Sequence, residues 1–185
     1  RPARLPWELA TLAVLLTACA SQAKRAPSTA LPPLRLAPAT LGKELALQQR
    51  LVFRFGSQVR EMDALLEVDA RDVRLAVQAM GRTGVTLQWD GAQLTEQRAP
   101  WLPSAVRSER VLDDVQFSLW PADAVRAALP ADWTLSDNGS TRELLHGGRA
   151  WLIRERVNAT TLQVRNVADG YDLTIESVAG GDVLP

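Results

Sequence analysis

The chain has very few of the side chains on which enzymes and metal sites most often depend. Among its 185 residues there is one cysteine, Cys19, one histidine, His146, and two lysines, Lys24 and Lys43. A single cysteine excludes a disulfide within the chain and a cysteine-rich zinc site. One histidine leaves little room for histidine-based catalysis. Because 21 basic side chains are balanced by 21 acidic ones, the composition also argues against a general nucleic-acid binder.

The chain length suits one domain of ordinary size with a single hydrophobic core. Hydrophobic residues make up 46% of the sequence and charged residues 23%, a balance that is typical of folded rather than disordered chains. The sequence contains no internal repeat and no sustained heptad pattern. A repeat array is therefore excluded as an architecture.

The first eighteen residues have the layout of a secretory signal peptide. Arg1 and Arg4 precede an apolar run over residues 9–16, which ends in two small residues. As a helix this run would be about 12 Å long, against a bilayer core of about 30 Å, so it is too short to remain as a transmembrane helix. We expect residues 1–18 to be removed on secretion.

Residues 16–19, with the sequence LTAC, resemble the lipobox of bacterial lipoproteins. In that motif cleavage falls before the cysteine, whose thiol then carries a diacylglyceryl group. The resemblance makes Cys19 the lipidation site and membrane lipid the partner held through it. In such lipoproteins an Asp directly after the lipidated cysteine commonly retains the protein in the inner membrane. Here that position is Ala20, so the resemblance implies a location on the periplasmic face of the outer membrane. A cysteine that only happens to follow an ordinary signal peptide is the alternative.

Residues 19–42 differ in composition from the rest of the chain. The stretch is rich in Ser, Ala, Lys and Arg, contains four prolines, and shows neither a helical nor a strand period. Such a sequence predicts an exposed, flexible tether behind the lipidated cysteine. We therefore expect the folded domain at residues 43–178 and a short C-terminal tail at 179–185.

Most of residues 44–177 alternate between apolar and polar side chains, the pattern of strands buried on one face. Asp90-Gly91 is a strong hairpin signal, and the other gaps between strands also have turn chemistry. The predicted strands are 44–55, 61–69, 73–79, 85–89 and 93–97, then 133–135, 142–145, 150–156, 161–167 and 171–177. Between the two groups, the spacing of apolar residues from Ser108 to Leu129 predicts two short helices. The expected class is mainly β with α: a large antiparallel sheet that curls around helices and encloses a cavity.

Three segments carry a resemblance to a known family: AMGRTGVTLQWDG at 79–91, RVLDDVQFSLWP at 110–121 and ALP at 128–130. They look like an uncharacterised family of bacterial lipoproteins that is often encoded with aryl-polyene pigment genes. That family is similar to the outer-membrane lipoprotein receptor LolB. The resemblance implies an open antiparallel half-barrel of the LolA/LolB type, whose concave apolar face is covered by short helices and accepts acyl chains. It also implies a periplasmic carrier protein as a partner.

LolB is known for an apolar residue on a protruding loop between early strands, which helps to pass cargo into the membrane. In the present chain the corresponding turn is only 81–84, which leaves the receptor activity open. Trp101 and Leu102, between two prolines, offer another exposed apolar tip, because aromatic rings suit the membrane interface. The alternative is that Trp101 and Leu102 fold back onto the core as a lid.

The alternation of side chains between the two faces of a strand, and the spacing of apolar residues on the helices, predict which side chains line the cavity. These residues are Leu47, Leu51, Phe53, Leu66, Leu75, Val77, Leu87, Leu112, Val115 and Leu119. An acyl chain or an aryl-polyene lipid is the expected ligand. No metal site and no cofactor is expected.

Few other residues are candidates for a catalytic or ligand-binding role. His146 precedes Gly147-Gly148 and is most simply part of a hairpin turn, since no nucleophile motif accompanies it. Asp113 and Asp114 are neighbours on a predicted helix and so point in different directions, which favours a structural or helix-surface role over an acid/base pair. The tryptophans at 89, 120, 133 and 151 fit either the core or a ligand pocket, with the core favoured.

We therefore expect a lipid-anchored protein without catalytic activity, which binds or transfers an amphiphilic cargo. The competing class is a structural or assembly lipoprotein with a filled core, which docks a protein of the envelope or pigment-biosynthesis machinery. A hydrolase or transferase would need a cluster of polar side chains that the sequence does not reveal. An open apolar cavity would favour the carrier, and a solid interior would favour the scaffold.

Overall fold

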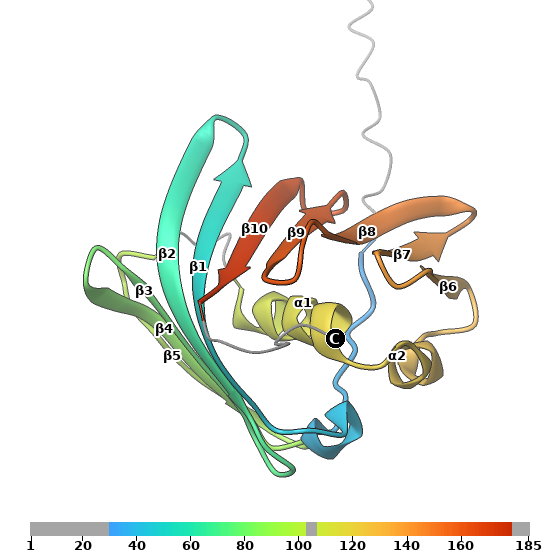
Figure 1. Ribbon diagram of the computed structural model, residues 1–185, viewed down its shortest axis with the longest axis horizontal. Helices are drawn as coiled ribbons and strands as arrows, with labels where there is room; N and C mark the ends of the chain where they lie inside the picture. The colour runs from blue at the N-terminus through green and yellow to red at the C-terminus, as the bar shows by residue number, and fades with distance from the viewer. Residues whose placement is uncertain (1–29, 103–106, 179–185) are drawn as a thin grey trace, which may run out of the picture.

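The computed structural model describes residues 30–102 and 107–178 (Figure 1). The predicted signal peptide, Cys19 and the predicted tail at 179–185 lie outside the described residues. Within them the chain forms ten strands, two α-helices and one short 3-10 helix. This composition confirms the expected class, mainly β with a small helical part.

The ten strands form a single antiparallel sheet. Its first half contains β1 (Leu45–Phe55), β2 (Gln58–Val68), β3 (Val73–Ala79), β4 (Arg82–Trp89) and β5 (Leu94–Arg98). Its second half contains β6 (Trp133–Asp137), β7 (Thr141–His146), β8 (Arg149–Arg156), β9 (Thr161–Asn166) and β10 (Tyr171–Ser177). Their order in space is β5-β4-β3-β2-β1-β10-β9-β8-β7-β6, so β5 and β6 are the two edges and the sheet does not close. The predicted open half-barrel is confirmed.

The two halves of the sheet meet where the first strand pairs with the last. β1 lies antiparallel to β10, with Leu51 opposite Ile175 and Phe53 opposite Leu173. Alternation along the strands decides which face is buried, as β3 illustrates: Val73 is buried while its neighbour Arg74 is exposed. The strand period of two thus places one apolar face on the concave side of the curved sheet.

Two helices lie on that concave side (Figure 1). α1 (Ser108–Leu119) buries Leu112 and Phe117 completely, and α2 (Ala122–Ala128) buries Val125. Trp120 separates the helices and is also fully buried. Pro121 stands just before α2, where its missing N–H costs no hydrogen bond. Both helices occur where the sequence predicts them.

A buried arginine holds the C-terminal end of α1 against the second half of the sheet. Arg142 on β7 donates from Nη1 to the carbonyl oxygens of Phe117 and Trp120, at 2.7 and 2.8 Å. Its Nε lies 2.6 Å from Asp137 Oδ2, which compensates the buried charge. Carbonyl groups at a helix end have no partner within the helix, so these bonds fix the position of α1.

The N-terminal segment 30–41 is packed against the domain, which corrects the expectation of an exposed tether over residues 19–42. Leu31, Leu34, Leu36 and Leu41 are 5 to 7% exposed and belong to the hydrophobic core. The segment ends in a 3-10 helix, Pro38–Leu41. Four leucines without a regular period predict no helix or strand, yet each of them reaches apolar surface in the folded protein.

Hydrogen bonds explain how an irregular segment is accommodated in the core. Gln116 on α1 accepts from the Leu36 N–H at 3.0 Å and donates to the Leu36 carbonyl oxygen at 2.8 Å. The indole N–H of Trp89 also donates to that carbonyl oxygen, at 2.7 Å. Buried backbone groups need such partners when no strand or helix supplies them. The domain therefore begins at or before residue 30, and not at residue 43.

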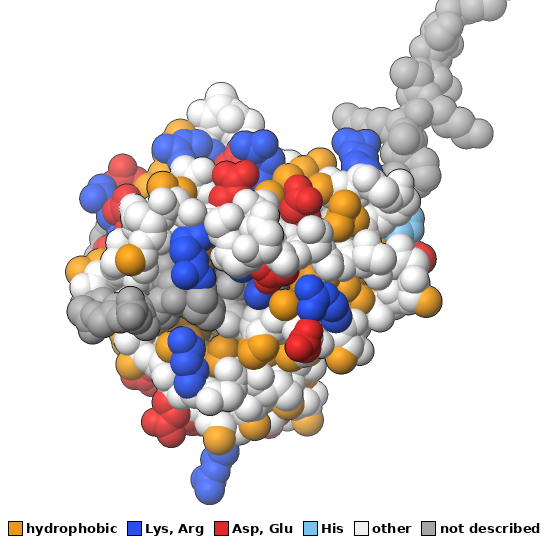
Figure 2. Space-filling model, turned by 45° about the vertical axis from the view of Figure 1, so that its right-hand side comes forward, with side chains coloured by type: hydrophobic (Ala, Val, Ile, Leu, Met, Phe, Trp, Pro, Cys, Tyr) orange, Lys and Arg blue, Asp and Glu red, His pale blue; other side chains and the backbone are white. Residues whose placement is uncertain are grey.

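The surface carries charges of both signs in close alternation. On the face shown in Figure 2, basic and acidic side chains are interspersed with apolar ones. Several of the exposed ion pairs join neighbouring strands, such as Arg50 with Glu61 and Arg165 with Asp172. On this face the distribution agrees with the balanced composition.

Candidate ligand-binding cavity

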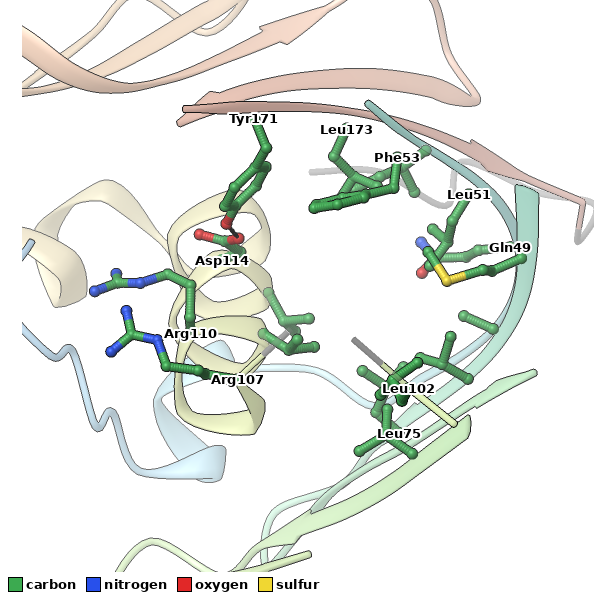
Figure 3. A pocket seen from close by; sticks show the side chains of 17 residues that line it. Gln49, Leu51, Phe53, Leu75, Leu102, Arg107, Arg110, Asp114, Tyr171 and Leu173 are labelled. Atoms are coloured by element: carbon green, nitrogen blue, oxygen red, sulfur yellow. Dashed lines mark hydrogen bonds between the residues drawn. The ribbon is translucent and has the colours of Figure 1, made fainter. Parts of the chain in front are cut away.

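An apolar cavity lies between α1 and the concave face of the first half of the sheet (Figure 3). Its volume is about 110 Å³. The sheet contributes Gln49, Leu51, Phe53, Met62, Ala64, Leu75, Val77 and Val85, together with Tyr171, Leu173 and Ile175 from β10. The wall is completed by Leu102, by Arg107 directly before α1, and by the α1 residues Arg110, Val111, Asp114 and Val115.

A larger hollow, here called the outer groove, adjoins this cavity. It has a volume of about 680 Å³ and shares Phe53, Met62 and Leu102 with the cavity. The remaining lining residues are Phe55, Gln58, Val59, Arg60, Glu61, Ala79, Met80, Arg82 and Trp101. Its rim carries Phe55, Val59 and Met80, which are among the exposed large apolar side chains. The outer groove thus connects exposed apolar surface to the cavity beneath α1.

Five of the ten residues predicted to line a cavity do so: Leu51, Phe53, Leu75, Val77 and Val115. The other five, Leu47, Leu66, Leu87, Leu112 and Leu119, do not line it and lie instead in the packed core, 0 to 4% exposed.

Two physical reasons account for these five corrections. At the end of the sheet near Trp89, the segment 30–41 covers the concave face, so inward-facing strand residues there meet protein and not open space. On α1 the residues that line the cavity are 110, 111, 114 and 115, spaced as one helical face, and Arg107 directly precedes the helix. Leu112 and Leu119 lie on the neighbouring face, and spacing alone did not distinguish the two.

Trp101 and Leu102 do not form an exposed tip, so that alternative is wrong and the lid alternative holds. Leu102 is 8% exposed, and Trp101 packs against the core. A Cβ atom added to Gly84 on β4 would lie only 3.1 Å from the Trp101 ring, which shows how closely the ring rests on the strand. The guanidinium of Arg82 covers the ring at 5.7 Å from its centroid.

The most exposed large apolar residue of the described early strands and turns is Met80, in the β3–β4 turn. The turn was expected at 81–84, but the structure places it at Met80 and Gly81, which have φ angles of 51° and 71°, and Gly84 is already part of β4. Met80 is 92% exposed. A methionine in the left-handed region is uncommon, and its position directly before a glycine at a hairpin is the signal that was overlooked.

One end of the cavity is polar. Tyr171 on β10 donates a hydrogen bond from its hydroxyl to Oδ2 of Asp114 on α1, and Figure 3 shows the tyrosine ring directed at that carboxyl group. Burial raises the pKa of Asp114 to about 7, although the bond from Tyr171 and the charge of Arg110 oppose the shift. Burial and the nearby Asp114 also raise the pKa of Tyr171. Asp114 is therefore largely neutral below pH 7.

Asp113, the neighbour of Asp114, faces the N-terminal segment. Its Oδ1 accepts from the Leu34 N–H at 3.1 Å, and its carboxylate also lies 3.6 to 3.8 Å from Arg110 and Arg35. Burial raises the pKa of Asp113. The expected structural hydrogen-bonding role of Asp113 is thus confirmed, whereas both carboxyl groups are buried and neither lies on an exposed helix surface.

The remaining candidate residues lie away from the cavity. His146 is at the end of β7, with Nε2 at 3.0 Å from Asp132 Oδ2, and its ring stacks on Trp133 beside the predicted hairpin turn. The tryptophans at 89, 120 and 133 are buried in the core, and Trp151 packs against it. None of these four lines the cavity, which confirms the core interpretation.

Three cavity residues on β10 were not predicted as such: Tyr171, Leu173 and Ile175. Their alternation along the strand was visible, but their place beside β1 depends on pairing between the two ends of the domain. Nothing local in the sequence specifies that pairing.

Residues 46–179 match a family whose description reads "Protein of unknown function (DUF3261)". The chain belongs to the DUF3261 family. No curated protein matches the chain. The family match starts one residue after β1 begins and therefore leaves out segment 30–41, which this DUF3261 protein nevertheless buries in its core.

In residues 30–102 and 107–178 of this DUF3261 protein, no three His, Cys, Asp or Glu side chains are grouped so as to hold a metal ion. Over the same ranges, no helix has both the length and the hydropathy that crossing a bilayer requires.

Proposed function

We propose that this DUF3261 protein is an outer-membrane-anchored lipoprotein that binds an amphiphilic cargo beneath α1 and transfers it at the membrane. The observation that supports this proposal is the apolar cavity together with the outer groove that adjoins it. A chain of methylene groups enters such a space because its apolar surface leaves water. The candidate cargoes are lipoprotein acyl chains and an aryl-polyene lipid.

The volumes suit a chain that is partly inserted. An engineered protein cavity of about 150 Å³ binds benzene, so the cavity of about 110 Å³ accepts a short stretch of acyl chain. The outer groove, at about 680 Å³, accommodates the rest. Burial of roughly 300 Å² of apolar surface contributes about 7 kcal/mol before the costs of association. That magnitude allows both binding and release, as transfer requires.

The exposed rim of the outer groove supports transfer at a lipid surface. Met80, at the tip of the β3–β4 turn, is 92% exposed, and Val59, beside the β1–β2 turn, is 51% exposed. The resemblance to LolB assigns membrane transfer to an apolar side chain between early strands, and Met80 is a side chain of that kind. Such a residue gains free energy when it enters the acyl region of a bilayer.

The proposed anchor is the lipidated Cys19, with the DUF3261 domain on the periplasmic face of the outer membrane. Only residues 20–29 separate Cys19 from the first described residue of the packed segment. Ten residues reach at most about 35 Å when fully extended. Several acyl chains on one cysteine hold a protein durably, because each buried methylene contributes about 0.8 kcal/mol. The anchor would keep the outer groove within reach of the lipid surface.

The binding proposal is tested by filling the cavity. Ala64 on β2 lines it, whereas the next residue, Leu65, is 46% exposed on the opposite face of the sheet. We expect Ala64→Phe to lower the affinity for a fluorescent hydrocarbon probe, such as 1-N-phenylnaphthylamine, by at least tenfold, because the phenyl ring occupies the space.

Leu65→Phe is the matched control and should bind the probe as the wild type does. Val115→Phe fills the same cavity from α1 and repeats the test if Ala64→Phe does not fold. Equal probe binding by the wild type, the filled variants and the control would rule the cavity out as the binding site. No binding by the wild type would favour the scaffold function instead.

A further inference from the structure

The polar end of the cavity contains two buried atoms without a hydrogen-bond partner. One is Oδ1 of Asp114, whose other oxygen accepts from Tyr171. The other is Nε of Arg110, one turn earlier on α1, whose ion-pair contact with Asp169 Oδ2 at 3.4 Å is not a hydrogen bond. Asp114 is only 7% exposed, and both residues line the cavity. Buried polar atoms are nearly always paired, so these two atoms are available to a polar group that enters this end of the cavity.

The charges around these atoms leave room for one negative group. Arg110 lies 3.6 Å from Asp113 and 3.4 Å from Asp169, and Arg107 lies 3.7 Å from Asp169. Arg35, 3.8 Å from Asp113, adds a third guanidinium group, so three guanidinium groups meet two carboxylates before Asp114 is counted. When Asp114 holds a proton, one positive charge is left over, which a monoanionic group balances. The group that fits is small, carries at most one negative charge, and both donates and accepts hydrogen bonds.

We propose that this end of the cavity binds the carboxyl group of a single-chain fatty acid. The ligand carbonyl oxygen accepts from Arg110 Nε–H, and one proton is shared between the ligand carboxyl and Asp114 Oδ1. The hydrocarbon chain then runs along the apolar wall of β1 to β4. This inference rests on the proposed function and adds a free fatty acid to the acyl cargoes that the same cavity accepts.

Proton sharing follows from the electrostatics of two carboxyl groups in one buried place. Two carboxylates in close contact cannot both be ionised, so the pair retains one proton. Burial raises the pKa of Asp114 to about 7, and Asp114 therefore supplies that proton at neutral pH and below. A methyl ester has no ionisable group and gains nothing from this arrangement.

The pH dependence involves every charged group near Asp114. These groups are Arg110 and Asp113 on α1, Arg107 directly before it, Asp169 in the β9–β10 turn, Tyr171 on β10 and, through Asp113, Arg35 of the N-terminal segment. Above pH 7 the free protein has lost the shared proton, and a fatty acid then binds only with uptake of a proton. Its affinity should fall about tenfold for each pH unit.

The experiment measures displacement of the hydrocarbon probe by dodecanoic acid and by methyl dodecanoate from pH 6 to pH 9. We expect the acid to weaken by about tenfold per pH unit above pH 7 and the ester to change by less than threefold. Asp114→Asn cannot ionise and should remove the pH dependence. Asp172→Asn, at the neighbouring exposed position on β10, is the control and should retain it.

Tyr171→Phe is a second variant, for which the direction of the change in the pH profile is predicted. The tyrosine hydroxyl lowers the pKa of Asp114, so its removal should move the fall in acid affinity to higher pH. Identical pH profiles for acid and ester, or a profile that Asp114→Asn leaves unchanged, would overturn this inference while probe binding upholds the proposed function. Loss of probe binding in the wild type would instead overturn the proposed function itself.

Discussion

At the scale of single residues, Asp113 and Asp114 show what a sequence reveals about a side chain. Neighbouring helix positions point in different directions, and the structure bears this out: Asp113 faces segment 30–41 and Asp114 faces β10. Their partners were not predictable, because Leu34 lies 79 residues from Asp113 and Tyr171 lies 57 residues from Asp114. The direction in which a side chain points is set locally by the helix, whereas its hydrogen-bond partner depends on how the whole chain folds.

The protonation of Asp114 predicts how stability depends on pH. Burial raises the pKa of Asp114 from 3.8 to about 7, so the folded protein holds a proton that the unfolded chain releases between these values. The Asp114 contribution to stability therefore falls as pH rises from about 4 to about 7 and is constant above that. Asp114→Asn cannot ionise and should escape this loss, which amounts to at most about 4 kcal/mol.

The measurement is urea denaturation of the wild type and Asp114→Asn at several pH values. Between pH 4 and pH 7, the free energy of unfolding of Asp114→Asn should rise relative to that of the wild type. Above pH 7 the difference between the two proteins should stay constant. A difference that is the same at every pH would mean that Asp114 is ionised in the folded protein.

At the scale of elements, the strands and helices were the most predictable features. Alternation along the strands and the changed spacing after Ser108 located all ten strands and both α-helices. The segment 30–41 was not predictable by the same means, because its leucines follow neither period. Its burial depends on the shape of the surface that α1 and the sheet present, and on side-chain partners such as Gln116.

The packing of segment 30–41 is tested at Leu34, which is 6% exposed. Leu34→Ala should lower the free energy of unfolding by about 2 to 4 kcal/mol, since it leaves a cavity in the core. Leu65→Ala, which shortens an exposed leucine on β2, should cost less than about 1 kcal/mol. Equal and small effects in urea denaturation would show that residues 30–41 are an exposed tether after all.

The contact between β4 and the Trp101–Leu102 segment makes a separate prediction. Gly84→Val places carbon atoms where the Trp101 ring now lies, at 3.1 Å from an added Cβ. We expect the segment to be displaced, with a loss of about 1 to 3 kcal/mol in stability and faster tryptic cleavage at Arg98. Thr83→Val, at the exposed preceding position, should change neither quantity. An unaltered cleavage rate in Gly84→Val would contradict the observed packing.

At the scale of the whole molecule, the sequence predicted the open curved sheet and the presence of an inner space but not the extent of that space. Parity identified the inward side chains of both halves, yet inward positions such as Leu47 and Leu66 are in the packed core while Leu51 and Leu75 line the cavity. The difference arises because segment 30–41 and α1 fill one part of the concave face and leave another part open. Which part of the concave face stays open therefore depends on contacts between residues that are far apart in the sequence.

The central claim is that the space beneath α1 holds a guest molecule. The most direct test is native mass spectrometry of the delipidated protein after reloading with dodecanoic acid, for the wild type, Ala64→Phe and Leu65→Phe. We predict a one-to-one adduct with the wild type and with Leu65→Phe, and none with Ala64→Phe. Absence of an adduct from all three proteins, or equal adducts in all three, would contradict the claim.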